Sequence, residues 1–570
     1  MFRTAAIVCA AAALAAPGVA SAAPTTLFPG VTYSRTTQYT GDGPVSMNVV
    51  TTPRPGGLYA LQPVLSNATV LGRETVSSIQ RRISREATAV GINGDRFTWD
   101  EGVPTGLLVQ SGVLAHYSHP GRSSIGVDTA GTVQVGRVST SGFWRGTGIA
   151  HPINLLNERP SPRKVALFTA AWGARTPEAP DSVEVTVAPF PPARAGIDLA
   201  GSVTGVAVGG GTTIPRDGAV LVAAGGTAAD SLWSEALLGS QVTVRLSLKP
   251  EPWNAVGDAI GGGPELVRAG TPILNAQEAL TGDQLFGRAP RAAVGQRRNG
   301  SIVLVAVDGR QPSFSVGITN ADLARTLVRL GCVTGSSVDA GGSVTLAFDG
   351  RVLNRPSDAT GERPVAEALL VTYSGVYAPP LEPVLSPDGD RRGDAQRFTY
   401  KLVRPSTVAV QLAGPDSVIR AVETGVKAPG TYSLPWNGRT ADGVLEPEGR
   451  WRWHVEAADD LGRKSSIDRT FSLNMTLGFV RTPRRLATGR PAAIAFTLAR
   501  PARIRVTVET TAGEIYRTVA VGQRAAGRVS VRWNGRDGRR KPLARGAYVI
   551  RVAASNQVGL TQVRLPITIG

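Results

Sequence analysis

The sequence has little cysteine and no long apolar run after its first 22 residues. Cys9 and Cys332 are the only cysteines among 570 residues. Cys9 lies in the N-terminal segment described below, so we expect no disulfide within the exported chain. Cys332 directly follows Gly331 and has no histidine near it in the sequence, which predicts a small buried residue and not a reactive thiol. A membrane helix needs roughly 18 to 20 consecutive apolar residues, so no transmembrane segment is expected.

Lysine is scarce as well, although the chain is strongly basic. Only six of the 61 basic residues are lysine, and the formal net charge is +18. An arginine-rich surface attracts anionic polymers such as phosphate-rich cell-wall glycans. The alternative is a compositional bias toward arginine that says nothing about partners. The basic residues are scattered and do not alternate with aromatic residues, so nucleic acid is not an expected partner.

The first 22 residues are typical of a signal peptide. Arg3 precedes an apolar run from Ala5 to Ala16, and Ala20-Ser21-Ala22 has the small residues that precede a cleavage site. We therefore expect an exported protein, secreted or associated with the cell wall.

Two stretches near the C-terminus repeat each other at a spacing of about 96 to 97 residues. FTYKLVRPSTVAVQL (398–412) matches AFTLARPARIRVTV (495–508), and the segments 432–462 and 529–559 match as well. In each copy β-branched and aromatic residues alternate with polar ones between Gly, Pro and Asn turns, which predicts antiparallel sheets. We expect two immunoglobulin-like β-sandwiches, residues 379–474 and 477–570.

Trp436 and Trp533 occupy equivalent places in the two copies and are predicted to anchor the two cores. Each is followed by Asn-Gly, a strong turn signal. The WNGRDGRRKPLARGAY segment resembles the immunoglobulin-like domain of the flagellar hook-capping protein family. In secreted enzymes this resemblance implies a spacer or a wall-contact module.

The loop SPDGDRRGD (386–394) precedes the first copy. Asp388, Asp390 and Asp394 are spaced so that their carboxylates could surround one ion. Ca²⁺ prefers such hard oxygen ligands, which predicts a structural calcium site; the alternative is a solvated acidic turn, because a full site needs six to eight oxygens. No cofactor is expected for catalysis.

Residues 28–376 consist of short strand-like segments separated by Gly-rich turns, with two helix-like stretches at 75–87 and 319–331. The first has Thr75 or Ser77 as a capping residue, and the second ends at Gly331, which suits a left-handed C-terminal position. These features predict an α+β domain with mixed β-sheets.

Each predicted helix leads into a strand that ends in an unusual loop. These loops are ATAVGINGDRF (87–97) and VTGSSVDAGGS (333–343), and DAIGGGPELV (258–267) is a third glycine cluster. Glycines let backbone N–H groups approach a ligand, so the loops are site candidates, although a tight turn explains any one of them equally well. The sequence has no nucleophile elbow and no phosphate-binding P-loop.

Eight blocks in the order of this chain resemble the phosphodiester glycosidase family, which includes the enzyme that removes N-acetylglucosamine from a phosphodiester. They are INGDRF, IPRDGAVL, AIGGGPEL, PRAAVG, VAVDGR, GITNADLARTLVRLGC, SVDAGGSVTL and NRPSDATGERPVAEALLV. The resemblance covers roughly residues 28–376 and implies a hydrolase acting on sugar-1-phosphodiesters of a glycan or glycolipid. The family pattern reads INGGFF where this chain has INGDRF, and it has a glycine where this chain has Ala340. Asp95 and Arg96 add bulk and charge to a loop expected to face the substrate, which predicts altered specificity or loss of activity.

Cleavage of a sugar–phosphate bond places positive charge on the anomeric carbon and negative charge on the leaving phosphate. Asp339 is predicted to act on the sugar as nucleophile or stabiliser, and Glu362 is the predicted second carboxylate if the reaction requires a base for water. Arg291 and Arg363 are predicted to clamp the phosphate, because a guanidinium binds two phosphate oxygens. The other predicted substrate-binding residues are Asn93, Gly94, Gly341, Gly342, Ser343, Thr345, Asn354 and Arg355.

Alternatives exist for these roles. Asp339 could be a turn acid that binds the N–H groups of Gly341 and Gly342. Arg291 and Arg363 could be structural partners of Asp308 or Glu362, and Asp308-Gly309 is typical of a hairpin turn. The alternative function is a non-catalytic envelope protein that binds anionic polysaccharide through a degenerate glycosidase domain and its β-sandwiches.

Overall fold

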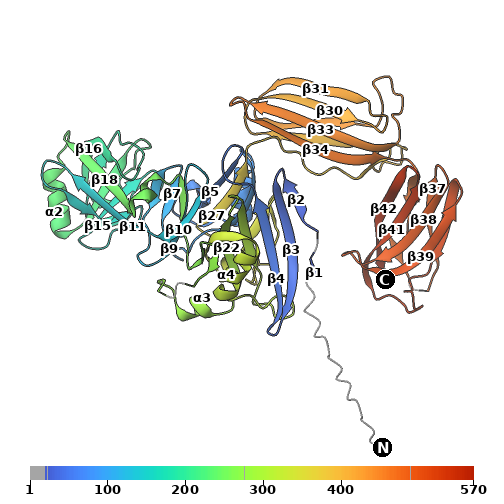
Figure 1. The fold of residues 1–570 in the computed structure, drawn as a ribbon, viewed down its shortest axis with the longest axis horizontal. Helices are drawn as coiled ribbons and strands as arrows, with labels where there is room; N and C mark the ends of the chain where they lie inside the picture. The colour runs from blue at the N-terminus through green and yellow to red at the C-terminus, as the bar shows by residue number, and fades with distance from the viewer. Residues whose placement is uncertain (1–19, 22, 275–276, 488) are drawn as a thin grey trace, which may run out of the picture. The chain divides into compact units, whose positions relative to one another are not determined.

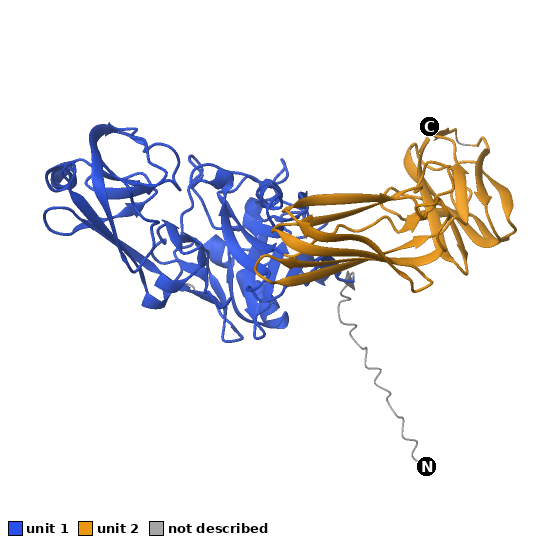
Figure 2. Ribbon diagram, turned by 90° about the horizontal axis from the view of Figure 1, so that it is seen from above, with its two compact units in different colours: residues 1–374 blue, residues 375–570 orange. Residues whose placement is uncertain are grey.

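The computed structural model describes residues 20–21, 23–274, 277–487 and 489–570 (Figure 1). It has two compact units, Met1–Ser374 and Gly375–Gly570 (Figure 2). Strands hold 52% of the residues and helices 8%, so the expected combination of mixed sheets and all-β sandwiches is confirmed. The predicted signal peptide lies outside the described residues except for Ala20–Ser21, the short strand β1.

The N-terminal unit contains three sheets that surround the candidate site. A nine-stranded sheet has the order β1-β3-β4-β23-β22-β24-β20-β21, with β2 paired to β3. Two five-stranded sheets have the orders β26-β25-β6-β27-β5 and β10-β9-β19-β7-β8. The bounds are β2 Thr25–Phe28, β3 Val31–Thr40, β4 Gly43–Thr52, β5 Tyr59–Leu65, β6 Thr88–Asn93, β7 Leu108–Gln110, β8 Val113–His116, β9 Ser123–Val127, β10 Val133–Arg137, β19 Asp258–Gly261, β20 Glu265–Arg268, β21 Thr271–Pro272, β22 Arg291–Arg297, β23 Ile302–Val307, β24 Cys332–Ser337, β25 Leu346–Phe348, β26 Arg351–Val352 and β27 Glu367–Tyr373.

Two central strands, β6 and β24, carry the predicted site loops at their ends. All residues of β6 are buried, and it pairs with β25 and β27. β24 pairs with β22 and β20 in the other sheet. Strands that are paired on both edges hold their ends rigidly, so the loops that follow them are well placed to carry a site.

Both predicted helices exist but are shorter than the sequence indicated. α1 spans Val76–Ile83, and the Thr75 hydroxyl caps it by accepting a bond from the Ser78 N–H. α4 spans Asn320–Arg329 and is followed by Gly331 with φ +85°. The two further α-helices are α2, Gly226–Glu235, and α3, Gly282–Phe286. No helix among the described residues is long and apolar enough to cross a membrane.

Cys332 begins β24 and is 1% exposed. Burial raises the pKa of its thiol to about 11, so the thiol stays protonated at neutral pH. The prediction of a small, unreactive core residue is confirmed.

A fourth sheet of the N-terminal unit was not foreseen as a separate layer. Its eight strands have the order β12-β11-β18-β16-β15-β17-β14-β13, and its core includes the buried Trp144. The strands are β11 Ser139–Arg145, β12 His151–Ile153, β13 Leu155–Leu156, β14 Val165–Thr169, β15 Glu178–Val187, β16 Asp198–Gly210, β17 Ala219–Ala224 and β18 Gln241–Lys249.

The C-terminal unit contains two β-sandwiches whose larger sheets have equivalent strand orders. One has the sheet β28-β34-β33-β30-β31 with the pair β29-β32, and the other has β36-β42-β41-β38-β39 with β35-β37-β40. The bounds are β28 Val384–Leu385, β29 Gln396–Leu402, β30 Ser406–Ala413, β31 Ile419–Lys427, β32 Gly430–Trp436, β33 Gly449–Asp459, β34 Lys464–Leu473, β35 Leu477–Arg481, β36 Arg485–Leu486, β37 Ala492–Leu498, β38 Ala502–Glu509, β39 Ile515–Arg524, β40 Gly527–Trp533, β41 Gly546–Asn556 and β42 Gly559–Ile569.

The prediction that Trp436 and Trp533 anchor the two cores is confirmed for only one of the sandwiches. Trp533 is 3% exposed and belongs to the second core, whereas Trp436 is only partly buried. Trp451 and Trp453 on β33 are fully buried and fill the first core instead. β33 carries them two residues apart, which places both on the inner face of the sheet.

Candidate functional site

The ends of β6 and β24 meet, and Asp339 lies at their junction. The Asp339 N–H donates to the carbonyl of Gly94 at 3.0 Å, and the Asn93 amide donates to the carbonyl of Asp339 at 3.0 Å. The side chain of Asp339 is 16% exposed. The two glycine-containing loops predicted as site candidates therefore form one structure around this carboxylate.

Asn93 holds this junction together and has no free polar atom. Its amide nitrogen also contacts the Gly94 carbonyl, and its Oδ1 accepts a bond from the Thr345 N–H at 3.2 Å. Both Asn93 and Thr345 are fully buried, and the Thr345 hydroxyl has no hydrogen-bond partner in the described part of the chain. The geometry gives Asn93 a positioning role, in contrast to the predicted contact with substrate.

Three arginines lie close to Asp339 or to the loop that follows it. Arg96 Nε is 3.8 Å from Asp339 Oδ1. Arg291 is 1% exposed, and its two terminal nitrogens donate to the carbonyls of Gln284 and Gly287. Burial lowers the pKa of Arg291 to about 10, and the positive charges of Arg96 and Arg310 act in the same direction. The carboxylates of Asp283 and Asp339 act in the opposite direction, so Arg291 lies within electrostatic range of two other cations and two carboxylates.

Arg310 is the exposed member of this group. Its guanidinium has no hydrogen bond or ion pair to another described residue, and it lies 3.2 Å from the position that a Cβ at Gly341 would occupy. Arg310 also has φ +60°, an uncommon conformation for a residue other than glycine. Strained backbone often occurs at functional sites. Arg310 is therefore the best-placed cation for a bound anion.

Gly341 and Gly342 have no side chains, so neighbouring side chains can pack directly against their backbone: Arg310 against Gly341, and Arg363 with Asp358 against Gly342. Gly341 has φ +70°, and a Cβ at Gly342 would lie 2.1 Å from Nη2 of Arg363 and from the Asp358 carboxylate. Any larger residue at Gly342 would displace that ion pair. The loop that begins at Asp339 thus requires glycine for close packing.

Arg363 is engaged by Asp358, with contacts of 2.7 and 3.0 Å. Its third nitrogen lies 3.5 Å from the buried hydroxyl of Ser343. The guanidinium also lies 5.2 Å above the ring of Trp99, which is 61% exposed. Arg363 is neutralised by Asp358, which makes it a weaker phosphate ligand than the sequence predicted, and it has no ion pair with Glu362.

Glu362 does not contact Asp339 through any hydrogen bond or ion pair of the described residues. Its two carboxylate oxygens accept bonds from the N–H and the hydroxyl of Ser77, at 2.7 and 2.6 Å, in the first turn of α1. A carboxylate at this position satisfies an unpaired helix N–H group and interacts favourably with the helix dipole. The predicted role as second catalytic carboxylate is replaced by helix capping.

Asp308 is a buried hydrogen-bond acceptor and not a hairpin turn. It accepts bonds from Asn354 Nδ2, the Arg355 N–H and Asn48 Nδ2. Burial raises the pKa of Asp308, while these bonds oppose the increase. Asn354 and Arg355, which were predicted to bind substrate, therefore anchor their loop to Asp308. The Arg355 guanidinium stacks on Phe314 at 4.8 Å.

A buried ionic cluster of Asp95, Arg122 and Glu367 supports the loop that follows β6. Arg122 binds both oxygens of Asp95 at 3.0 and 2.9 Å, and the two side chains are 4% and 0% exposed. Glu367 lies beside Asp95, and burial together with the Asp95 charge raises the pKa of Glu367 well above its usual value. The Asp95 N–H donates to Glu367. The cluster fixes Asp95 inward, so the next residue, Arg96, points to Asp339.

A cavity of about 510 Å³ lies beyond the same loop and is lined by Thr98, Thr105 and His116 among others. His116 Nδ1 contacts two backbone carbonyls, and its Nε2 lies 3.6 Å from Glu158. None of the predicted catalytic residues lines this cavity.

The three predicted calcium ligands converge in the C-terminal unit. One carboxylate oxygen from each of Asp388, Asp390 and Asp394 lies within 4.8 Å of the others. Their other hydrogen bonds come from backbone N–H groups, including that of Phe479 to Asp390 at 2.8 Å, and from the Ser386 hydroxyl to Asp388 at 3.4 Å. Burial raises the pKa of Asp388, and the charges of the other two aspartates act in the same direction.

The sequence did not single out Arg310 or Arg122, and it marked Asp95 only as a departure from the family pattern and not as the partner of Arg122. The VAVDGR block contains Arg310, and the departure INGDRF contains Asp95. Their partners are remote, since Arg122 is 27 residues from Asp95. The only sign of Asp95 and Arg310 in the sequence is that each is a charged residue next to a glycine in a loop.

Two family models match parts of this chain. Residues 193–372 match the family model of phosphodiester glycosidase, and residues 483–557 match that of the FlgD Ig-like domain. The first match includes Arg291, Arg310 and Asp339.

Similar proteins are known from several bacteria. The SPbeta prophage-derived uncharacterized protein YomE of Bacillus subtilis is 39% identical over 84 residues, 15% of this chain, and the match spans only 13% of that relative. A hypothetical protein from Synechocystis is 25% identical with a TM-score of 0.52, over 63% of this chain and 64% of that one. A Burkholderia pseudomallei protein is 20% identical with a TM-score of 0.50, over 62% and 96%.

The family matches and the sheet architecture agree on the composition of the molecule. Residues 193–372 are similar to the phosphodiester glycosidase family, and residues 483–557 are similar to the FlgD Ig-like domain.

Proposed function

We propose that the N-terminal unit hydrolyses the glycosidic bond of sugar-1-phosphodiesters in an extracellular or cell-wall glycan. The proposal depends on one observation: Asp339 is a partly exposed carboxylate next to Arg96, with Arg291 within electrostatic range and Arg310 beside Gly341 in the loop that follows. The predicted signal peptide supports export, and the family match supports the class of bond.

The charges of the reaction match this arrangement. When the bond between the anomeric carbon and the phosphate oxygen breaks, the sugar becomes positive and the phosphate keeps the electron pair. Asp339 stabilises the sugar, either electrostatically or by bonding to the anomeric carbon, and Arg310 with Arg96 stabilises the phosphate. Water then adds to the anomeric carbon, displacing Asp339 where a bond had formed, and loses its proton to solvent, which leaves free sugar and a phosphate monoester. Phosphate is a weak base and leaves without a proton from the enzyme, which is consistent with Glu362 being engaged at α1.

Replacing Arg310 tests the phosphate side of this proposal. We expect Arg310→Asn to lower kcat/KM for a nitrophenyl or nucleotide sugar phosphodiester by about 10- to 100-fold, because a hydrogen-bonded contact to a charged group is worth about 1.5–3 kcal/mol. Asparagine tolerates the positive φ of this position, so the backbone is not strained. Initial-rate assays of free sugar release measure the change.

Arg351→Asn is the matched control, because Arg351 is an exposed arginine on β26 with no described ion pair. Its kinetics should equal those of the wild type, and Arg310→Lys should recover part of the loss. Equal rates for Arg310→Asn and the wild type would exclude Arg310 from phosphate binding.

A second candidate function is non-catalytic binding of anionic polysaccharide. The contact between Arg96 and Asp339 favours it, because a cation over the carboxylate neutralises the group that hydrolysis needs. Under this alternative the wild type binds a phosphodiester glycan but releases no sugar from any phosphodiester substrate. The same sugar-release assay therefore separates the two functions.

We also propose that Asp388, Asp390 and Asp394 hold a structural Ca²⁺, since three carboxylates on one loop provide the hard oxygens that this ion prefers.

Adding Ca²⁺ at about 100 times its Kd should stabilise the C-terminal unit by about 2.7 kcal/mol. Calorimetry with Ca²⁺ and with EGTA measures this difference. Asp390→Asn should abolish it, while Mg²⁺ should not replace Ca²⁺; an unchanged transition in the wild type would exclude the site.

A further inference from the structure

The positive charge of the chain is concentrated in the last sandwich. Residues 477–570 contain 18 Lys and Arg but only three Asp and Glu, a formal charge of +15 out of +18 for the whole chain. Residues 379–474 contain 13 of each and are neutral. The two repeats, whose larger sheets have equivalent strand orders, thus differ sharply in net charge, which a general bias toward arginine does not explain.

Strand pairing shows which residues of the two repeats are equivalent. Thr407 and Ala409 pair with Ala458 and Glu456 in the first sandwich. Arg503 and Arg505 pair with Ser555 and Ala553 in the second. The second repeat therefore has two arginines where the first has Thr407 and Ala409, and Ala553 where the first has Glu456.

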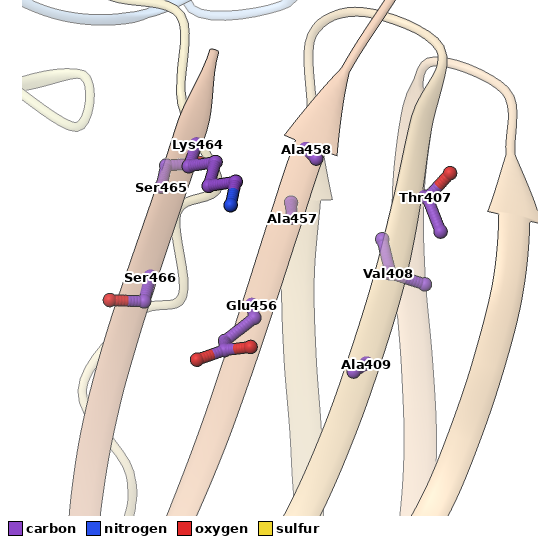
Figure 3. A pocket seen from close by; sticks show the side chains of 9 residues that line it. All are labelled: Thr407, Val408, Ala409, Glu456, Ala457, Ala458, Lys464, Ser465 and Ser466. Carbon is purple, nitrogen blue, oxygen red and sulfur yellow. The ribbon is translucent and has the colours of Figure 1, made fainter. Parts of the chain in front are cut away.

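Each repeat has a groove at this place. In the first, the groove is lined by small side chains of β30, β33 and β34, with Glu456 and Lys464 as its charged residues (Figure 3). In the second, a groove of about 350 Å³ is lined by Arg503, Arg505 and Arg551.

The arginines of the second groove are under-neutralised. Arg503 and Arg505 are exposed on β38, and their guanidinium groups have no ion pair with any described residue. Arg551 and Arg564 share a single acid, Glu509, at 2.9 and 3.0 Å. Side chains two residues apart on a strand lie about 6.8 Å apart on one face, so the groove presents a row of positive charges.

We propose that this arginine groove on β38, β41 and β42 binds a linear polymer of phosphodiester-linked units. Guanidinium groups bind phosphate oxygens in pairs, and a row of them can bind successive phosphates of one chain. No aromatic side chain lines the groove, so it offers no surface on which nucleic acid bases could stack. The choice of phosphate rests on the proposed function, since one polymer then supplies both the scissile bond and the anchoring charges.

The test measures binding of poly(glycerol phosphate) to the full chain, and it needs no catalysis. Arg503→Thr with Arg505→Ala places the residues of the first repeat in the second. We expect affinity to fall at least about tenfold, and the slope of log K against log salt to decrease by about two. The reverse change, Thr407→Arg with Ala409→Arg, should raise affinity, which keeps the test valid if the first variant is unstable.

The control is Arg528→Ser with Arg532→Ser, which removes the same charge from exposed positions on β40. Its affinity should stay within about threefold of the wild type. Equal losses of affinity in the two double variants would show that net charge alone binds the polymer, and would overturn the proposal that the groove is the binding site. Equal or tighter binding of hyaluronate or duplex DNA would overturn the phosphodiester polymer as its partner. Binding without sugar release would leave the groove intact and count against the proposed hydrolysis.

Discussion

Asp339→Asn is expected to reduce sugar release from a phosphodiester substrate by about 10³-fold or more. The substitution keeps the shape of the side chain but removes the negative charge that faces the developing positive charge of the sugar. KM should change little, because the phosphate is bound by Arg310 and Arg96. Initial rates with a UDP-sugar or a nitrophenyl phosphodiester measure both quantities.

Folding of the Asp339→Asn variant should be normal. The backbone of Asp339, and not its side chain, makes the contacts with Gly94 and Asn93. Asp349→Asn serves as the matched control, since Asp349 is exposed in a turn with φ +52°, a conformation that asparagine adopts readily. If Asp339→Asn keeps more than about a third of the wild-type rate while Asp349→Asn keeps all of it, the carboxylate has no part in the chemistry.

Arg96 departs from the family pattern and lies next to Asp339, so this departure bears directly on which substrates the site could accept. The sequence alone showed that Asp95 and Arg96 add charge to a glycine-rich loop. The structure adds the direction of each side chain: Asp95 is held inward by Arg122, and Arg96 extends over the site. A substrate with a second anionic group could bind Arg96 and free Asp339, whereas a neutral glycoside could not. The contact between Arg96 and Asp339 is therefore compatible with both expectations from the sequence, an enzyme of altered specificity and a non-catalytic binding protein.

Local pattern was enough to predict the elements that carry the site. The capping hydroxyl of Thr75, the left-handed Gly331 and the strand before Asp339 each depend on a few neighbouring residues. The division of the C-terminal unit into two repeats followed from self-similarity. These signals are local or periodic, and a single sequence contains them in full.

Long-range partners could not be predicted in this way. Glu362 reaches Ser77 across 285 residues, and Asn354 reaches Asp308 across 46. An isolated glutamate or asparagine in a loop has the same local sequence whether it caps a helix or binds a substrate. Charge alone suggested that Glu362 was catalytic, but its position at the first turn of α1 depends on tertiary packing that no local pattern encodes.

Arg122→Ala is expected to destabilise the N-terminal unit by about 3–5 kcal/mol. The substitution leaves Asp95 buried and without its cation, next to Glu367, whose pKa is already raised by burial and by Asp95. Breaking one half of a buried ion pair costs far more than the intact pair contributes, because the remaining charge stays out of water. Urea or thermal unfolding of the full chain should show one transition shifted, that of the N-terminal unit.

The matched control for Arg122→Ala is Arg245→Ala, which removes an arginine paired with Asp198 at 2.8 Å on the surface of β18. Both partners are more than half exposed, so the cost should be within about 1 kcal/mol. Comparable shifts in the two variants would mean that Asp95 is solvated after Arg122 is removed. In that case the β6 loop would not depend on the ionic cluster, and Arg96 would need another residue to hold it over Asp339.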